Sequence, residues 1–196
     1  MRKKSYQFNH PKGFSFIEIV IVSALAFIIL FVIYDIFLIS QKANRLGDEK
    51  LELIQNGRII LDRLSRELRQ TPDLVTELPS TKDEVGFPPA NELQFQDGHD
   101  LEDIQYLRYY LNSQLLNRQR IVYYFFDEPE TYVYWDSHDE FEDPPEFSIL
   151  EEKTIAEYIN NIQFYGNKVI YIDVLLNKNE TNEHLFTGVW GRNTRQ

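Results

Sequence analysis

Residues 12–40 read KGFSFIEIVIVSALAFIILFVIYDIFLIS, and this stretch decides the fold class of the chain. From Phe14 to Ser40 only two residues are charged, and the 16 residues from Ile19 to Tyr34 carry no charge at all. A helix rises about 1.5 Å per residue, so the stretch is long enough to cross a hydrocarbon core of ~30 Å. Residues 14–40 are therefore predicted to form a transmembrane helix.

Charge is distributed unevenly along the 196 residues, and the net charge is −11. Residues 1–13 carry four bases and no acid, 41–70 carry seven bases and five acids, and 71–196 carry nine bases and 24 acids. Because every base of the first segment precedes the apolar run, we expect a cytoplasmic N-terminus and an exported acidic body. The negative body argues against direct contact with nucleic acid.

Three interpretations of the apolar segment compete. A secretory signal peptide has a shorter apolar core followed by a small-residue cleavage site, whereas residues 36–43 read IFLISQKA. A plain single-span anchor leaves Glu18 unexplained, because an ionisable side chain deep in a bilayer costs about 2–3 kcal/mol and usually has a partner. The third interpretation, a processed filament subunit, accounts for Glu18.

The stretch Lys12-Gly13-Phe14-Ser15-Phe16-Ile17-Glu18 resembles the processing site of type IV pilins and type II secretion pseudopilins. In that family a short basic leader ends in Gly, Phe usually follows, and Glu is the fifth residue of the mature chain. The resemblance implies that residues 1–13 are a prepilin leader, that a prepilin peptidase cleaves between Gly13 and Phe14, and that Phe14 is N-methylated. It also implies that Glu18 acts in subunit assembly, since its carboxylate can neutralise the Phe14 ammonium of a neighbouring subunit.

Two alternatives remain open at this end of the chain. Glu18 can instead be a carboxylate that reaches the membrane interface. Asp35 stands where many major pilins have a helix-kinking proline, so the resemblance does not extend to a kink, and Asp35 is interpreted as a solvated charge at the edge of the span or as a second assembly contact.

Residues 41–70 are predicted to continue the helix as an amphipathic segment. The charged residues, including the i,i+4 pairs Asp62/Arg66 and Arg63/Glu67, are predicted to face water. Gln70-Thr71-Pro72 is predicted to end the helix. The apolar and small residues recur at helical spacing within a stripe about 120° wide, and they are Ala43, Leu46, Leu53, Ile54, Gly57, Ile60, Leu61, Leu64 and Leu68.

Residues 71–196 are predicted to form an exported, β-rich globular domain. The proline-rich segment 71–91 is predicted to be loop, Gly166-Asn167 a tight turn, and Thr154–Ile159 a short helical turn. The fold class is therefore α+β, with one long helix packed on an antiparallel sheet, as in pilins. Period-two patterns predict strands at Glu92–Gln96, Ile104–Leu111, Arg120–Phe126, Thr131–Trp135, Ile162–Tyr165, Val169–Leu176 and Leu185–Trp190.

The acidic loop Asp136–Pro145 offers weak candidates for a Ca²⁺ site, because carboxylate oxygens are the ligands that this cation prefers. The candidates are Asp136, Asp139, Glu140 and Asp143, but no EF-hand pattern is present and a solvated acidic loop is the favoured interpretation. No Walker loop, Gly-rich dinucleotide turn, HExxH or GxSxG occurs, and there is no cysteine. We therefore predict no catalytic residues, metal or cofactor.

The end of the helix at 60–70 and the C-terminal pattern at 159–193 resemble the J-type minor pseudopilin of type II secretion and PilW-like minor pilins. The resemblance implies a non-enzymatic minor subunit of a type II secretion pseudopilus or a type IV pilus, near the tip, that helps to initiate assembly. It would be a single-pass protein of the cytoplasmic (inner) membrane. Its partners would be other pilin or pseudopilin subunits, prepilin peptidase and inner-membrane lipid, with no nucleic acid or small-molecule substrate.

Two other functions remain as alternatives. One is a subunit of a competence-type pilus in DNA uptake, in which another subunit would contact the DNA. The other is a membrane-anchored exported enzyme or sensor domain, which would be favoured by a cleft holding a carboxylate of strongly raised pKa.

Overall fold

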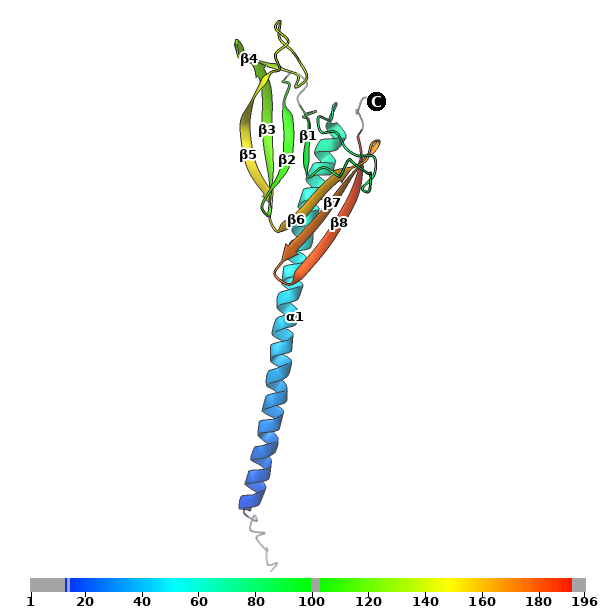
Figure 1. The fold of residues 1–196 in the computed structure, drawn as a ribbon. Helices are drawn as coiled ribbons and strands as arrows, with labels where there is room; N and C mark the ends of the chain where they lie inside the picture. Colours follow the sequence, from blue (N-terminus) through cyan, green and yellow to red (C-terminus); the bar gives the residue numbers. More distant parts are fainter. Residues whose placement is uncertain (1–12, 14, 100–102, 192–196) are drawn as a thin grey trace, which may run out of the picture. The chain divides into compact units, whose positions relative to one another are not determined.

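A computed structural model describes residues 13, 15–99 and 103–191 of the chain. These residues form one long helix, α1 (Phe16–Gln70), followed by a series of strands (Figure 1). The chain divides into two compact units, Met1–Leu46 and Gly47–Gln196. The strands are β1 (Glu92–Gln96), β2 (Tyr106–Asn112), β3 (Leu115–Phe125), β4 (Glu128–Val133), β5 (Glu146–Ala156), β6 (Ile159–Tyr165), β7 (Val169–Lys178) and β8 (Thr181–Trp190).

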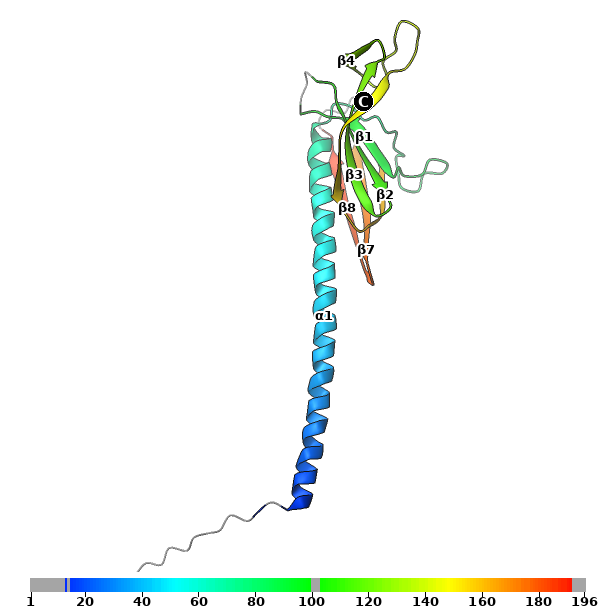
Figure 2. The same cartoon turned by 90° about the vertical axis from the view of Figure 1, so that its left-hand side faces the viewer.

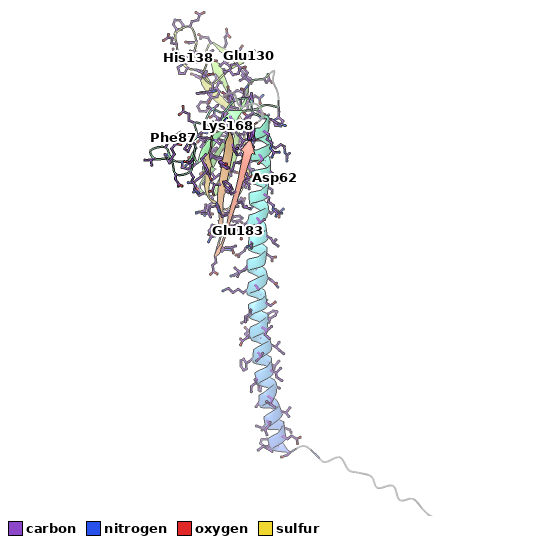
Figure 3. All side chains as sticks on the ribbon, turned by 90° about the vertical axis from the view of Figure 1, so that its right-hand side faces the viewer. Asp62, Phe87, Glu130, His138, Lys168 and Glu183 are labelled. Atoms are coloured by element: carbon purple, nitrogen blue, oxygen red, sulfur yellow. The ribbon has the colours of Figure 1, made fainter. Side chains whose placement is uncertain are left out.

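The first unit contains the apolar part of α1. Residues 15–40 of this part are all exposed, and their side chains project from the helix on all sides (Figure 3). By length and composition, α1 is long and apolar enough to cross a membrane. A continuous apolar surface of this size is unfavourable in water, so the first unit is consistent with a single-pass membrane segment.

The second unit contains two antiparallel sheets. The first has the order β1-β2-β3-β4, with β5 also paired to β3, and the second has the order β6-β7-β8. The sequence predicts a single antiparallel sheet. The antiparallel pairing of the strands is confirmed, but the strands form two sheets and not one. The sheets are connected through Ala90 and Phe164, whose backbones exchange hydrogen bonds of 3.0 and 2.7 Å.

The core of the second unit lies between α1 and the two sheets. Both sheets lie on the same side of the C-terminal half of α1 (Figures 1 and 2). Gly57 permits the close approach, because a Cβ at this position would lie 1.9 Å from Leu185 Cδ1. The predicted stripe is confirmed at its centre, where the buried residues of α1 include Leu53, Gly57, Ile60, Leu64 and Leu68.

The helix ends where the sequence predicts, at Gln70. Thr71 is fully buried, and its hydroxyl lies 2.7 Å from the carbonyl oxygens of both Asp73 and Gln96. Since one hydroxyl proton serves one acceptor at a time, Thr71 shares its donor between the loop and β1. The turn after α1 is thereby fixed against the edge of the first sheet.

The largest error of the sequence prediction concerns residues 146–159. Thr154–Ile159 is not a helical turn, because residues up to Ala156 belong to β5 and Ile159 begins β6. Strand β3 also begins at Leu115, five residues before the predicted start, and β8 begins at Thr181, four residues before the predicted start at Leu185. By contrast, β1 has the predicted bounds, and Gly166 takes the left-handed conformation (φ +112°) expected of a tight turn.

Candidate functional site

The predicted processing site lies at the beginning of α1. Gly13 is exposed, whereas Phe14 lies outside the described residues. The Ser15 carbonyl accepts backbone N–H groups from Glu18 at 3.0 Å and from Ile19 at 3.3 Å. Glu18 is therefore in the first helical turn, where a carboxylate interacts favourably with the positive end of the helix dipole.

Glu18 and Asp35 are both exposed on a helix without interruption. No proline occurs within α1, and α1 is helical throughout Phe16–Gln70. Neither side chain has a hydrogen-bond or ion-pair partner among the residues that the structure describes. Two carboxylates on the otherwise apolar, exposed segment 16–40 of α1 need partners other than the described residues if they are to enter a bilayer.

The acidic loop is organised around one of the weak calcium candidates, Asp139. Its Oδ1 atom accepts the backbone N–H groups of Phe141 at 2.7 Å and Asp143 at 2.8 Å. That carboxylate therefore stabilises a turn. Within residues 13, 15–99 and 103–191, no group of three or more His, Cys, Asp or Glu side chains is arranged to hold a metal ion, and Asp136, Asp139, Glu140 and Asp143 are not brought together as one.

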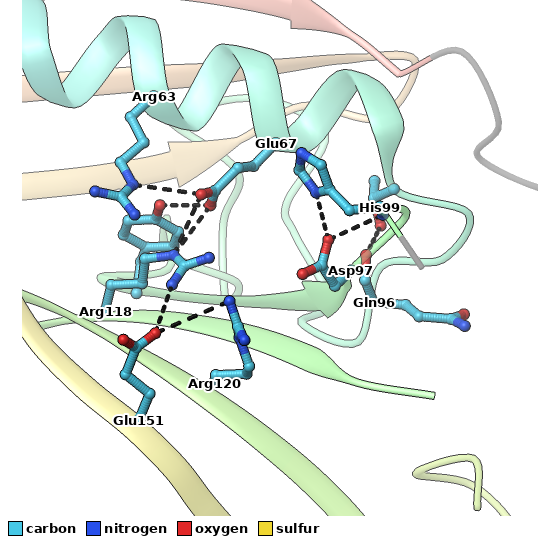
Figure 4. Close-up of polar contacts among 10 residues, drawn as sticks. Arg63, Glu67, Gln96, Asp97, His99, Arg118, Arg120 and Glu151 are labelled. Atoms are coloured by element: carbon cyan, nitrogen blue, oxygen red, sulfur yellow. Dashed lines mark hydrogen bonds and ion pairs between the residues drawn. The ribbon is translucent and has the colours of Figure 1, made fainter. Parts of the chain in front are cut away.

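A buried polar cluster joins α1 to the first sheet (Figure 4). Glu67 is only 7 % exposed and accepts a 2.5 Å hydrogen bond from the Tyr109 hydroxyl. Arg118, 6 % exposed, places its Nε atom 3.2 Å from Glu67 Oε1, and Arg63 Nε lies 3.3 Å from the same oxygen. The sequence prediction that the Arg63/Glu67 pair faces water is therefore wrong for Glu67.

The cluster is held together by charge as well as by geometry. Burial raises the pKa of Tyr109, and the neighbouring Glu67 carboxylate raises it further. Burial opposes the charged form of Arg118, but Glu67 outweighs this effect and the pKa of Arg118 is raised. Arg118 also lies 3.7 Å from Glu151 on β5. Arg118 therefore stays charged at every physiological pH and links the helix to two strands.

A second set of polar contacts connects α1 to the β7–β8 hairpin. Glu49 is buried and accepts hydrogen bonds from Asn179 Nδ2 at 2.9 Å and Thr181 Oγ1 at 3.3 Å. Close to it in the chain, Glu52 pairs with Lys178 at 2.5 Å and Lys50 pairs with Glu183 at 2.9 Å. We name these contacts the hairpin clasp. They hold the hairpin turn against the helix at 49–52.

The outer side of the second sheet carries a smaller charged group. Asp173 is paired with Lys82 at 2.7 Å and with His184 at 2.6 Å. Burial opposes ionisation of Asp173, but the hydrogen bonds from Lys82 and His184 outweigh it and lower the pKa of this carboxyl. The hydrogen bond to Asp173 raises the pKa of Lys82. The group fixes the loop around Lys82 to β7.

Comparison with known proteins identifies no relative. No family model matches the chain, no curated protein matches it, and no solved structure matches it.

The sequence prediction missed both buried acids of α1, although one signal was present. Glu49 and Glu67 occupy positions of the apolar stripe, since 49, 53, 57, 60, 64 and 67 follow one helical face. A carboxylate on a buried face requires a partner. That requirement predicts a cation or hydroxyl on the covering sheet, but it does not identify Arg118 or Tyr109.

Proposed function

We propose that the chain is a membrane-inserted, pilin-like structural subunit, most similar to a minor subunit of a type II secretion pseudopilus or a type IV pilus. The observation that carries the proposal is the motif Gly13-Phe14 with Glu18, at the start of an apolar helical segment, residues 16–40, that no described part of the chain covers. In this function the first unit joins a hydrophobic bundle of helices and the acidic body faces outward.

The arrangement of Glu18 supports an assembly role. Cleavage after Gly13 would create an ammonium on Phe14, four residues before Glu18 in the chain. An ammonium and a carboxylate are each unfavourable in lipid, and pairing them between staggered neighbours removes both costs. The pairing would make insertion into the bundle specific for subunits in the correct axial register.

The charge state of the body agrees with a structural function. Among the described residues, the carboxyls whose pKa is shifted are Glu151, Glu152 and Asp173, and the pKa of each is lowered. Hydrogen bonds from neutral side chains lower the pKa of Glu152, whereas hydrogen bonds and neighbouring cations lower those of Glu151 and Asp173. A general acid requires a raised pKa. The alternative function, an exported enzyme or sensor domain, would be supported by a carboxyl of raised pKa, and the shifted carboxyls among the described residues do not provide that support.

The first test is the covalent state of the N-terminus. We expect the membrane form isolated from cells to have lost residues 1–13 and to carry one added methyl group on Phe14. Intact-mass measurement and N-terminal sequencing of the purified protein check this result. A protein that still begins at Met1 would contradict the proposal and leave a simple anchored domain.

The second test is the substitution Glu18→Ala. Removing the carboxylate leaves the Phe14 ammonium of a neighbour unpaired in lipid at a cost of about 2–3 kcal/mol, so incorporation into fibres is expected to fall about tenfold or more. Membrane insertion and cleavage are expected to stay largely intact. Quantitative immunoblotting of sheared fibres against whole membranes measures the ratio.

Asp35→Ala is the matched control, because Asp35 is the other acid of the apolar segment and a solvated edge charge is the favoured of its two interpretations. We expect its incorporation to stay within about twofold of the unchanged protein. Normal incorporation of Glu18→Ala would count against the assembly role.

A further inference from the structure

A groove lies between the end of α1 and the end of β8. It encloses about 1230 Å³ and is lined by Arg66, Arg69, His99, Thr187 and Trp190, with Asp62 as the one acid among its described lining residues. Small-molecule pockets enclose about 300–1,000 Å³. The size of the groove therefore suits a segment of polypeptide better than a metabolite.

The groove is cationic within an acidic body. Arg66 and Arg69 are exposed, and neither guanidinium has a hydrogen-bond or ion-pair partner among the described residues. The predicted i,i+4 pair of Asp62 with Arg66 is not formed there. Two guanidinium groups that have no partner among the described residues lie on one wall; they favour an anionic occupant, and their planar donors match carboxylates.

The groove also has an aromatic wall. The side chain of Trp190 is 66 % exposed at the end of β8. An exposed indole gains from contact with a second aromatic ring beyond what burial of its area alone provides. A fitting occupant therefore combines carboxylates with an aromatic side chain.

The chain itself contains a segment of that chemistry. Residues 136–145, DSHDEFEDPP, hold five acids and no Lys or Arg, and Phe141 is 81 % exposed. The bonds from Phe141 and Asp143 to Asp139 fix the turn that presents this ring. Glu140 and Glu142, on either side of Phe141, have no hydrogen-bond or ion-pair partner through their side chains in the described part of the chain.

We propose that the groove binds the acidic loop 136–145 of a second copy of this chain. Carboxylates of the loop would pair with Arg66 and Arg69, and Phe141 would contact Trp190. Because the loop and the groove are different patches, the contact is heterologous, and a heterologous contact that does not close into a ring adds subunits indefinitely. The proposal concerns the body alone and does not depend on cleavage at Gly13.

The test is binding of the peptide DSHDEFEDPP, labelled with a fluorophore, to the full chain in detergent micelles. Fluorescence anisotropy is expected to show saturable binding at chain concentrations below about 1 mM. Because the contact is electrostatic at an exposed surface, affinity is expected to fall as salt rises from about 0.05 to 0.5 M. No saturable binding up to that concentration of chain would overturn the proposal.

The decisive variant is Arg66→Glu combined with Arg69→Glu, which reverses the charge of the groove. We expect its affinity for the peptide to fall about tenfold or more. Arg58→Glu is the matched control, because Arg58 is also exposed on α1 but does not line the groove, and it should bind within about twofold of the unchanged chain. Equal binding by the double variant would overturn the proposal.

A peptide of reversed charge shows whether the double variant loses binding because its charges no longer match the peptide or because it no longer folds. When each Asp and Glu of the peptide is replaced by Lys, it should bind the double variant more tightly than it binds the unchanged chain, because the signs of both surfaces are then reversed. Failure of this rescue, with near-ultraviolet circular dichroism of the double variant unchanged, would show that the groove does not recognise charge and would refute the proposal.

Discussion

Arg118→Met should destabilise the second unit by about 3–5 kcal/mol, because removing one partner of a buried ion pair is strongly destabilising and leaves the Glu67 carboxylate with Arg63, which is more exposed than Arg118, as its remaining described cation. Glu67 would then have to take up a proton or remain ionised beside Tyr109 and the apolar core, and both states raise the free energy of the folded protein. For a chain of this length the expected fall in melting temperature is about 6–20 °C. Thermal unfolding in detergent, followed by near-ultraviolet circular dichroism, measures it.

Arg108→Met is the matched control in the neighbouring strand. Arg108 also makes a two-point contact with a carboxylate, at 2.5 and 2.8 Å from Glu92, but its side chain is 31 % exposed. Exposed pairs contribute about 0–1 kcal/mol. If Arg118→Met melts at the same temperature as Arg108→Met, the buried cluster does not stabilise the fold as inferred.

The combination of Arg118→Met with Glu67→Gln provides a second check. The amide that replaces the carboxylate has no charge that needs Arg118, and its oxygen can still accept the hydrogen bond from Tyr109, so most of the lost stability should return. Glu67 and Arg118 are in contact, so the two substitutions should be strongly non-additive. Simple addition of the two single effects would contradict a direct pairing.

Phe164→Ala is expected to cost about 3–5 kcal/mol, the usual range for truncating a buried aromatic ring. Phe164 is fully buried, belongs to the core between α1 and both sheets, and exchanges backbone hydrogen bonds with Ala90. A cavity at this position opens where the two sheets meet. Equilibrium unfolding by urea in detergent, monitored by the fluorescence of the two tryptophans, measures the loss.

Phe147→Ala is the comparison for this substitution. Phe147 is the same residue type on β5, but its side chain is 55 % exposed. Its truncation should cost less than about 1 kcal/mol, since surface substitutions rarely cost more. A similar loss from both variants would mean that Phe164 does not occupy the centre of the core.

The helix and its end could be predicted from the sequence because both depend on local patterns. The apolar run, the stripe at helical spacing and Thr71-Pro72 each act within a few residues, and the structure confirms them. The tight turn at Gly166-Asn167 is local in the same sense, because glycine adopts the required positive φ at no steric cost.

The missed strand shows where such patterns fail. Residues 146–156 read EFSILEEKTIA, without the alternation of apolar and polar residues that marks a half-buried strand. The register of β5 against β3 shifts between Leu116 and Asn117 and again between Arg120 and Ile121. Each irregularity displaces the alternation by one residue, so the pattern in the sequence is lost although the pairing is extensive.

The buried cluster around Glu67 could not be predicted from local sequence patterns, for a different reason. Glu67 and Arg118 are separated by 51 residues, and Glu67 also has Arg63 four residues before it as an ordinary helical partner. The local pair is sufficient to explain both charges at the surface. Only the packing of β2 and β3 on α1 shows that the carboxylate is covered.

The hairpin clasp has a mechanical consequence. Its four contacts attach Glu49, Lys50 and Glu52, which lie within a single turn of the helix, to the β7–β8 hairpin. A force that pulls α1 lengthwise away from the body acts on all four contacts in shear, so they share the load. These polar contacts attach the body to α1 at residues 49–52, so they would resist such a force before the hydrophobic core does.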